Sequence, residues 1–294
     1  MNKALKNPVT YILFLLPTMF LFTLFFIYPV INATYYSFTS WNGISNVVKF
    51  TGLANYSRAM NDPNFWIAVK NNGLFILFSV FIQVPIIILF SLLIANVKKL
   101  KGLYKTAVFA PSVMSTAVIG ILWGFIYEPD IGLMNNFLGL FGIDKIYWLS
   151  DRSWAMISIL ITNGWQWTGF YIVMVLAAII SIPKELDEAA MIDGATGWQR
   201  ARKITVPLIM PIISVVIMLS VAGAMKAADI VLVMTKGGPS GATDVMATYM
   251  LKHSIKSFKY GFGNSIAVLI FIFTLIITVL YQLLVAKRTE RIEY

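Results

Sequence analysis

Six long apolar segments alternate with shorter polar connections along this chain. They cover approximately residues 11–36, 73–97, 106–127, 155–182, 204–234 and 263–286. About 20 apolar residues in a helix cross a hydrocarbon core about 30 Å thick, so each segment is long enough to span a membrane. Strands of a membrane barrel would be about ten residues long with strict alternation, and that pattern is absent. The pattern therefore predicts an all-α integral membrane protein with six transmembrane helices.

The composition supports this prediction, because 59% of the residues are hydrophobic and 12% are charged. Ordinary soluble domains carry about 25% charged residues. The first apolar segment lacks a small-residue cleavage site, so we interpret it as a retained helix rather than a signal peptide. The chain has no cysteine, which excludes disulfides and cysteine metal sites. His253 has no second histidine or acidic cluster nearby in the sequence, and we expect no metal site.

The positions of the basic residues predict the orientation. An even number of spans puts both termini on one side, and most lysine and arginine clusters fall on that side: Lys3, Lys6, Lys98, Lys99, Lys101, Lys105, Arg200, Arg202, Lys203, Lys287, Arg288 and Arg291. The positive-inside rule makes this side cytoplasmic. Since the net charge of +10 is spread over loops beside the membrane, it fits anionic lipid better than nucleic acid.

The most polar stretch between two spans, residues 181–207, has the pattern of a bent pair of short helices. Pro183 suits the first turn of a helix, where its missing N–H costs nothing. Gly194 suits the left-handed residue that ends that helix. Thr196 and Gln199 have the spacing of a capping box, which predicts the start of a second helix. Apolar side chains on such an elbow outside the bilayer favour a docking surface for another protein.

The same stretch resembles the EAA loop of ATP-binding-cassette (ABC) importer permeases. The resemblance rests on Glu188-Ala189-Ala190, Gly194, Ile204 and Val206-Pro207 at their relative spacing, although the family usually has leucine where Val206 stands. It implies that residues 183–207 form a coupling helix that inserts into a cleft of a cytoplasmic ATPase. The implied coupling residues are Glu188, Ala189, Ala190, Asp193 and Gly194. The alternative is an ordinary polar connector between two membrane helices.

Other passages carry the resemblance over nearly the whole chain. Residues 50–56, reading FTGLANY, are similar to a passage after the first helix of carbohydrate-importer permeases, and predict a turn followed by a short amphipathic helix. The chain resembles permeases of the MalF/UgpA type, which implies the type I ABC importer permease fold. It also implies alternating access, a second homologous permease in a heterodimer, two ATPase subunits, and a lipid-anchored or periplasmic solute-binding protein in bacteria. No G-x-x-x-x-G-K-[ST] motif is present, so ATP and Mg²⁺ would bind to the ATPase partner and this chain would not be an enzyme.

These inferences give an expected domain organisation. Residues 1–10 are a cytoplasmic tail, residues 11–38 the first transmembrane helix, and residues 39–66 an extracytoplasmic segment. Residues 67–286 are the permease core with five transmembrane helices, and residues 287–294 are a second cytoplasmic tail in contact with phospholipid. The expected location is the bacterial plasma membrane.

The fourth span contains amides and aromatic rings where lipid-facing apolar residues are expected. Asn163, Gln166, Trp167 and Phe170 have i, i+3, i+4 and i+7 spacing, which predicts one helix face. Amides exposed to hydrocarbon would lose hydrogen bonds, so this face should meet a cavity or another helix. Amides and rings together suit a sugar, and the resemblance places these positions in a substrate cavity. The alternative is polar contact between helices.

The third and fifth spans supply the other candidate substrate residues. Ser112 follows Pro111, which can kink its helix. Ser220, Lys226 and Asp229 lie in the fifth span, where ionisable groups usually face an interior. Lys226 and Asp229 could instead neutralise each other as an i, i+3 ion pair. Trp148 and Trp154 are typical of anchors at the membrane interface.

Other functions remain as alternatives. The transported solute could be glycerol phosphate or another small polar molecule rather than a sugar. An ion-coupled secondary transporter would carry internal repeats and an acidic relay, and neither is visible in the sequence. A membrane-embedded enzyme would need a convergent set of catalytic groups, and Lys226 with Asp229 alone does not provide one.

Overall fold

The structure is a computed structural model that describes residues 8–283, and within them it contains helices and one isolated β-bridge, between Thr39 and Phe50, but no strand. The predicted tail at 287–294, the end of the sixth span and residues 1–7 lie outside this range. Four helices are long and apolar enough to cross a membrane: Tyr11–Ser37, Pro63–Asn96, Ala155–Ser181 and Tyr260–Tyr281. Two bent helix pairs raise the number to as many as six if each is one span, in agreement with the predicted six.

The chain divides into two compact units. Unit 1 comprises Met1–Asp62 and Met250–Phe271, and unit 2 comprises Pro63–Tyr249 and Ile272–Tyr294.

Unit 1 contains the first span and the short helices that follow it. The span runs without a break through α1 (Pro8–Phe22), the π-helical η2 (Thr23–Ile27) and α2 (Tyr28–Ser37). The predicted short helix after the turn is α3 (Ala54–Met60), and Asn55 Nδ2 ties it to the carbonyls of Ser37 (2.9 Å) and Thr39 (2.8 Å). In η5 (Lys252–Lys256), burial lowers the pKa of His253, whose ring lies edge-on to Phe262.

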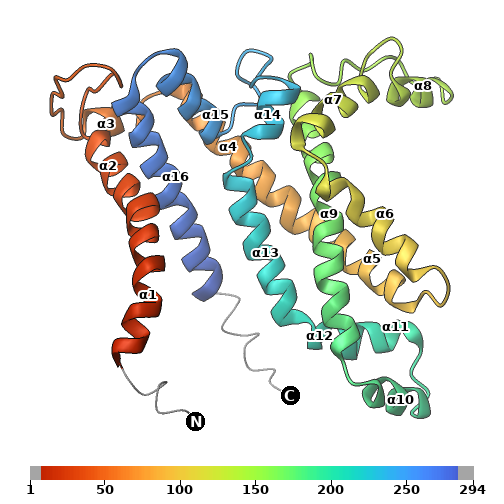
Figure 1. Ribbon diagram of the computed structural model, residues 1–294. Coiled ribbons are helices and arrows are strands. Elements are labelled where there is room, and N and C mark those ends of the chain that lie inside the picture. The colour runs from red at the N-terminus through yellow and green to blue at the C-terminus, as the bar shows by residue number, and fades with distance from the viewer. Residues whose placement is uncertain (1–7, 284–294) are drawn as a thin grey trace. The chain divides into compact units, whose positions relative to one another are not determined.

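Unit 2 is organised around α9 (Ala155–Ser181), which matches the fourth predicted span closely. It packs against α5 (Val84–Asn96) and α6 (Lys101–Val113), as Figure 1 shows. Gly169 permits the approach to α6, because a Cβ there would lie 1.6 Å from the Val108 carbonyl oxygen. A core of buried aliphatic side chains fills the space between α5, α9 and α13 (Met210–Met225), including Ile87, Val175 and Ile213.

The second span begins about ten residues earlier than predicted, because α4 (Pro63–Phe78) and the π-helical η3 (Ser79–Gln83) precede α5. The polar residues in the first part of α4 hid this earlier start from the hydropathy pattern. Asn72 Nδ2 donates to the Ala224 carbonyl (2.8 Å), and Asn72 Oδ1 accepts from the Met246 N–H (2.8 Å). Asn71 Nδ2 donates to the carbonyls of Ala242 and Asp244. These amides bind other parts of unit 2, so they do not end the helix.

The third and fifth predicted spans are both broken. The helix continues past Pro111 to Val113, and the chain turns by 99° before α7 (Thr116–Ile126), which Ser115 caps. Pro111 therefore lies inside the helix, and the chain bends at residues 114–115 instead. In the fifth span, Gly197–Leu208 and Met210–Met225 meet at 67°. A second interruption at residues 226–228 precedes α14 (Asp229–Met234).

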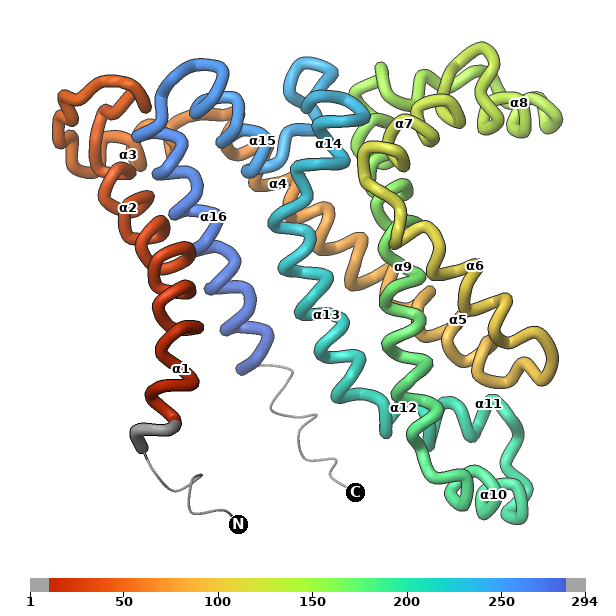
Figure 2. Tube along the Cα trace, viewed as in Figure 1, coloured from red at the N-terminus to blue at the C-terminus, as the bar shows by residue number. Residues whose placement is uncertain are grey.

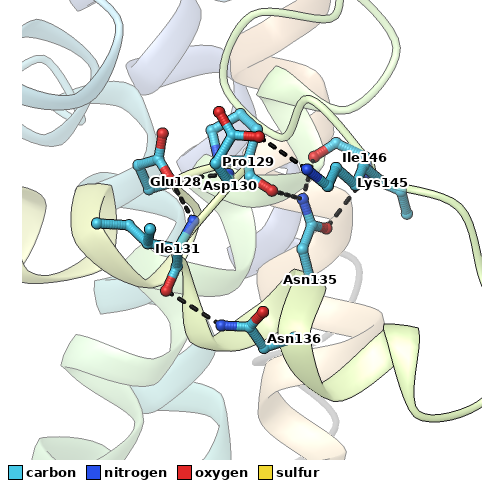
Figure 3. Close-up of polar contacts among 8 residues, drawn as sticks. All are labelled: Glu128, Pro129, Asp130, Ile131, Asn135, Asn136, Lys145 and Ile146. Carbon is cyan, nitrogen blue, oxygen red and sulfur yellow. Dashed lines mark hydrogen bonds and ion pairs between the residues drawn. The ribbon is translucent and has the colours of Figure 1, made fainter.

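The connection after α7 is held by side chains that bond to its backbone (Figure 3). Glu128 accepts from the N–H groups of Asp130 and Ile131, and Lys145 pairs with Asp130 at 2.8 Å. Asn135 in α8 (Leu133–Gly139) donates to the Ile146 carbonyl at 2.9 Å. Its Oδ1 accepts from Trp148 Nε1 at 2.8 Å, and Trp148 is 6% exposed. Trp148 is thus a buried support rather than the predicted interface anchor.

The polar stretch after α9 forms the predicted elbow, residues 183–207. It contains α10 (Lys184–Ile192), α11 (Gly197–Arg200), the π-helical η4 (Ala201–Thr205) and α12 (Val206–Leu208). Figure 2 shows the chain leaving the end of α9, turning through α10 and α11, and entering α13. Within unit 2, the elbow lies at the opposite end of α9 from α8 (Figure 1). The remaining short helix, α15 (Met246–Leu251), follows α14.

Candidate functional site

A cavity of about 240 Å³ opens inside unit 2 between η3, α7, α9, α13 and α14. Five of the predicted substrate residues line it: Asn163, Trp167, Ser220, Lys226 and Asp229. Residues from two different predicted spans, the fourth and the fifth, therefore meet at one place.

Helix α9 presents Asn163, Trp167 and Tyr171 to this cavity. Successive residues at i and i+4 lie on one face of an α-helix, so these three form a stripe. The predicted face instead combined Asn163 and Trp167 with Gln166 and Phe170. The prediction included residues three positions apart, which lie toward the neighbouring side of the helix. Gln166 and Phe170 do not line the cavity.

Gln166 is 1% exposed and supports the break in the third span. Its Nε2 donates to the Met114 carbonyl at 3.3 Å and to Thr116 Oγ1 at 3.2 Å, so it ties α9 to both sides of residues 114–115. These bonds provide the polar contact between helices that was the alternative for Gln166, and its substrate contact stays a prediction. Phe170 is 41% exposed beside the Tyr171 ring, and Ser112 Oγ donates within its own helix to the Phe109 carbonyl at 2.6 Å.

Lys226 and Asp229 both reach the cavity, and no ion pair joins them among the described residues. Lys226 follows the C-terminus of α13, where the helix dipole favours a cation, and Asp229 begins α14, where it favours an anion. Each charge is thus stabilised by its own helix end. Ser220 is buried and lines the cavity together with Tyr171. The cavity therefore presents the Lys226 ammonium group, the Asp229 carboxylate and the Ser220 hydroxyl to a polar ligand.

Four polar lining residues were missed from the sequence: Ser79, Gln83, Thr116 and Tyr171. Ser79 and Gln83 were detectable, because they stand four residues apart in an otherwise apolar segment. Gln83 is 3% exposed and also donates to Thr168 Oγ1 at 3.3 Å, so its amide connects η3 to α9. Thr116 could not be assigned before the break at residues 114–115 was known.

The elbow has the predicted local structure. Gly194 has φ +77°, and its N–H donates to the Met191 carbonyl at 3.0 Å, while the Ala195 N–H donates to the Ala190 carbonyl at 2.9 Å. This is the hydrogen-bond pattern of a Schellman motif. Thr196 and Gln199 make both bonds of the capping box. Arg200 pairs with Asp187 and joins α11 to α10.

The outer surface of the elbow is partly apolar. Ile192 is 87% exposed and Trp198 is 68% exposed. Of the predicted coupling residues, Glu188, Ala189, Asp193 and Gly194 are exposed. Ala190 is 9% exposed, and its coupling role stays a prediction. Within the described residues, no group of histidine and acidic side chains could hold a metal ion.

Comparisons with known proteins show the family of this chain. Residues 64–292 match the family described as binding-protein-dependent transport system inner membrane component. The lactose transport system permease protein LacF of Rhizobium radiobacter is 34% identical over 84% of this chain and 85% of its own. The trehalose/maltose transport system permease protein MalF of Thermococcus litoralis is 30% identical over 92% of this chain and 91% of its own. A solved chain of a bacterial ABC transporter involved in the import of the acidic polysaccharide alginate superposes with a TM-score of 0.83, at 25% identity over 99% of this chain and 98% of that chain.

Proposed function

This chain belongs to the family of binding-protein-dependent transport system inner membrane components, and from this premise we propose that it carries a sugar or oligosaccharide across the membrane. It is a permease subunit of an ABC importer with the fold of such permeases, and it is not the subunit that hydrolyses ATP. We propose alternating access as its mechanism.

The observation that supports a sugar substrate is the cavity lined by Asn163, Trp167, Ser220, Lys226 and Asp229. Sugar hydroxyls need both donors and acceptors, and sugar C–H faces pack on aromatic rings. The amide, the hydroxyl and the two charged groups supply the donors and acceptors, and the indole supplies the ring. Relatives named for lactose and for trehalose/maltose support the same class. Since ligand pockets typically measure about 300–1,000 Å³, we propose that a second homologous permease completes this smaller cavity.

The elbow is the proposed contact with the ATPase subunits. Two cytoplasmic ATPase subunits would bind ATP and Mg²⁺, and one would receive Glu188, Ala189, Asp193 and Gly194 in a cleft. Closure of the ATPase dimer would then move the elbow together with α9 and α13, the helices on either side of it. An extracytoplasmic solute-binding protein would deliver the sugar to the opposite end of α9.

This assignment fixes the proposed topology. The elbow and both termini lie in the cytoplasm, residues 39–66 lie outside, and residues 67–286 form the permease core. Lys98, Lys99, Lys101 and Lys105 then lie on the cytoplasmic side together with the elbow, as the positive-inside rule favours.

Two alternatives make different demands on the same residues. Lys226 favours an anionic solute such as glycerol phosphate, but Asp229 at the same cavity opposes it. An ion-coupled secondary transporter would leave the elbow and its exposed Ile192 and Trp198 without a role.

Uptake by the reconstituted complex, measured with a panel of oligosaccharides, acidic sugars and glycerol phosphates, tests the proposal. Trp167→Ala should raise the half-saturation concentration for the transported sugar by roughly tenfold, about 1.4 kcal/mol, because it removes a ring from the cavity. Phe170→Ala is the matched control, since Phe170 lies on the same helix with similar exposure, 41% against 38%, but outside the cavity. An unchanged half-saturation concentration in Trp167→Ala would contradict the cavity assignment, and uptake without the ATPase would contradict the transporter class.

A further inference from the structure

A second cavity, of about 550 Å³, lies behind the elbow. Its walls come from the end of α5, the start of α6, the end of α9, and from α10, α11 and η4. Its lining combines apolar side chains, including Leu92, Ile180 and Ile204, with the cationic side chains of Lys101, Lys184 and Arg200. The sugar cavity shares none of these residues. This second cavity is therefore a separate, amphiphilic site.

The two lysines stand where helix dipoles disfavour them. Lys101 is the first residue of α6 and Lys184 is the first residue of α10, so each cation lies beside the positive end of a helix. Lys101 Nζ makes one hydrogen bond, to the Ala95 carbonyl at 2.9 Å, which leaves it further donors. Two positive helix ends and two ammonium groups thus meet in one cavity, where an anion would be strongly attracted.

The acidic groups nearby offset only part of this charge. Asp187 lines the cavity, but it pairs with Arg200. Glu185 lies in the first turn of α10 and does not line the cavity. Lys101 and Lys184 are therefore the cationic groups of the lining that its carboxylate does not pair with.

The apolar part of the lining indicates what kind of anion fits. Ile180 is 54% exposed near the end of α9, a helix long and apolar enough to cross a membrane, and it lines the cavity. A free inorganic anion would gain nothing from Leu92, Ile180 and Ile204, whereas a phospholipid would bury its acyl chain there. Clusters of lysine and arginine beside a membrane span are typical of binding sites for anionic lipids. We propose that this cavity binds an anionic phospholipid, with its phosphate at Lys101 and Lys184 and its acyl chain along Ile180.

Such a lipid would connect the elbow to the membrane-spanning core. Its phosphate would bridge α6 and α10, which no ion pair joins within the described residues. The movement of α10 against α6 would then depend on the lipid of the surrounding leaflet. This consequence for coupling rests on the proposed function, but the binding itself does not.

The test measures lipid binding to the full chain purified with the subunits that accompany it, in a neutral detergent. The probes are phosphatidylglycerol, phosphatidylcholine and inorganic phosphate, and native mass spectrometry reports the bound lipid. The double variant Lys101→Gln/Lys184→Gln should weaken phosphatidylglycerol binding at least about tenfold, because hydrogen bonds to charged groups are among the strongest. The control, Lys98→Gln/Lys99→Gln, removes two exposed lysines of the same connection that do not line the cavity, and should bind as the unmodified chain does.

A second variant covers the case in which the lysine double variant does not fold. Ile180→Glu keeps both lysines and places an acid among the apolar side chains of the lining, so it should also weaken phosphatidylglycerol binding. Equal weakening in the control pair, unchanged binding in both cavity variants, or equal binding of phosphatidylcholine would overturn the proposal. Competition by inorganic phosphate as strong as that by phosphatidylglycerol would show a free-anion site and would overturn the lipid assignment. None of these results depends on transport, so the proposed function is tested separately.

Discussion

Polar side chains inside the spans of unit 2 have two different roles. Gln166 and Asn72 bond to the backbone of neighbouring segments, whereas Asn163 and Ser220 line the cavity. Both roles place a polar residue in an apolar segment, so hydropathy cannot separate them. The sequence predicts that such residues face inward, and the structure shows which ones reach open space. Asn163 and Trp167 could be predicted as neighbours, but Tyr171 was missed because the face was extended by the wrong helical step.

The variant Gln166→Leu separates these two roles. It removes the hydrogen bonds to Met114 and Thr116 across the break between α6 and α7, so the chain should lose roughly 1–3 kcal/mol of stability. The half-saturation concentration for the sugar should stay within about twofold of the unmodified value. Thermal unfolding in detergent and uptake in vesicles provide the two measurements. An unchanged unfolding midpoint together with altered sugar selection would place Gln166 among the substrate residues instead.

At the scale of elements, local signals were the most informative. The elbow was predicted from a proline, a glycine and a capping pair, and all three act within a few residues of their own position. The break at residues 114–115 was not predicted, because the visible signal, Pro111, lies inside α6. Gln166, which is about 50 residues away in sequence, bonds to both sides of the bend, and Ser115 caps the helix that follows it. Contacts of that kind cannot be derived from the local pattern.

The elbow variants Glu188→Lys and Gly194→Pro should uncouple ATP hydrolysis from uptake in the assembled complex. Gly194 has φ +77° and its N–H is bonded to Met191, and proline can provide neither the angle nor the donor. Glu188 is exposed on α10, where a lysine would reverse its charge at the proposed ATPase contact. Hydrolysis and uptake are measured in the same vesicles, with uptake expected to fall much further than hydrolysis.

Glu185→Lys is the matched control, because it makes the same charge reversal on the same helix outside the predicted coupling residues. Unimpaired uptake in Glu188→Lys and Gly194→Pro, or an equal loss in Glu185→Lys, would count against a specific coupling role.

At the scale of the whole molecule, the sequence predicted the helical class, the approximate spans and the family. The extent of α4 had to come from the structure, because Asn71 and Asn72 of this helix bond to residues far away in the sequence. The cavity lined by Asn163 and Trp167 and the elbow lie on different parts of unit 2, and α9 and α13 contribute to the cavity and flank the elbow. Because the same two helices reach both places, we propose that an ATPase acting on the elbow changes the shape of the cavity.

Cross-linking from single cysteines tests that central claim most directly, since the chain has no cysteine of its own. Ala189→Cys places a thiol on the exposed face of α10, and Leu133→Cys places one on α8, at the other end of α9. With a short reagent that joins thiols to lysines, Ala189→Cys should form a covalent product with the ATPase, and Leu133→Cys should not. Equal products from both positions, or none from Ala189→Cys in a complex that still transports, would contradict the account.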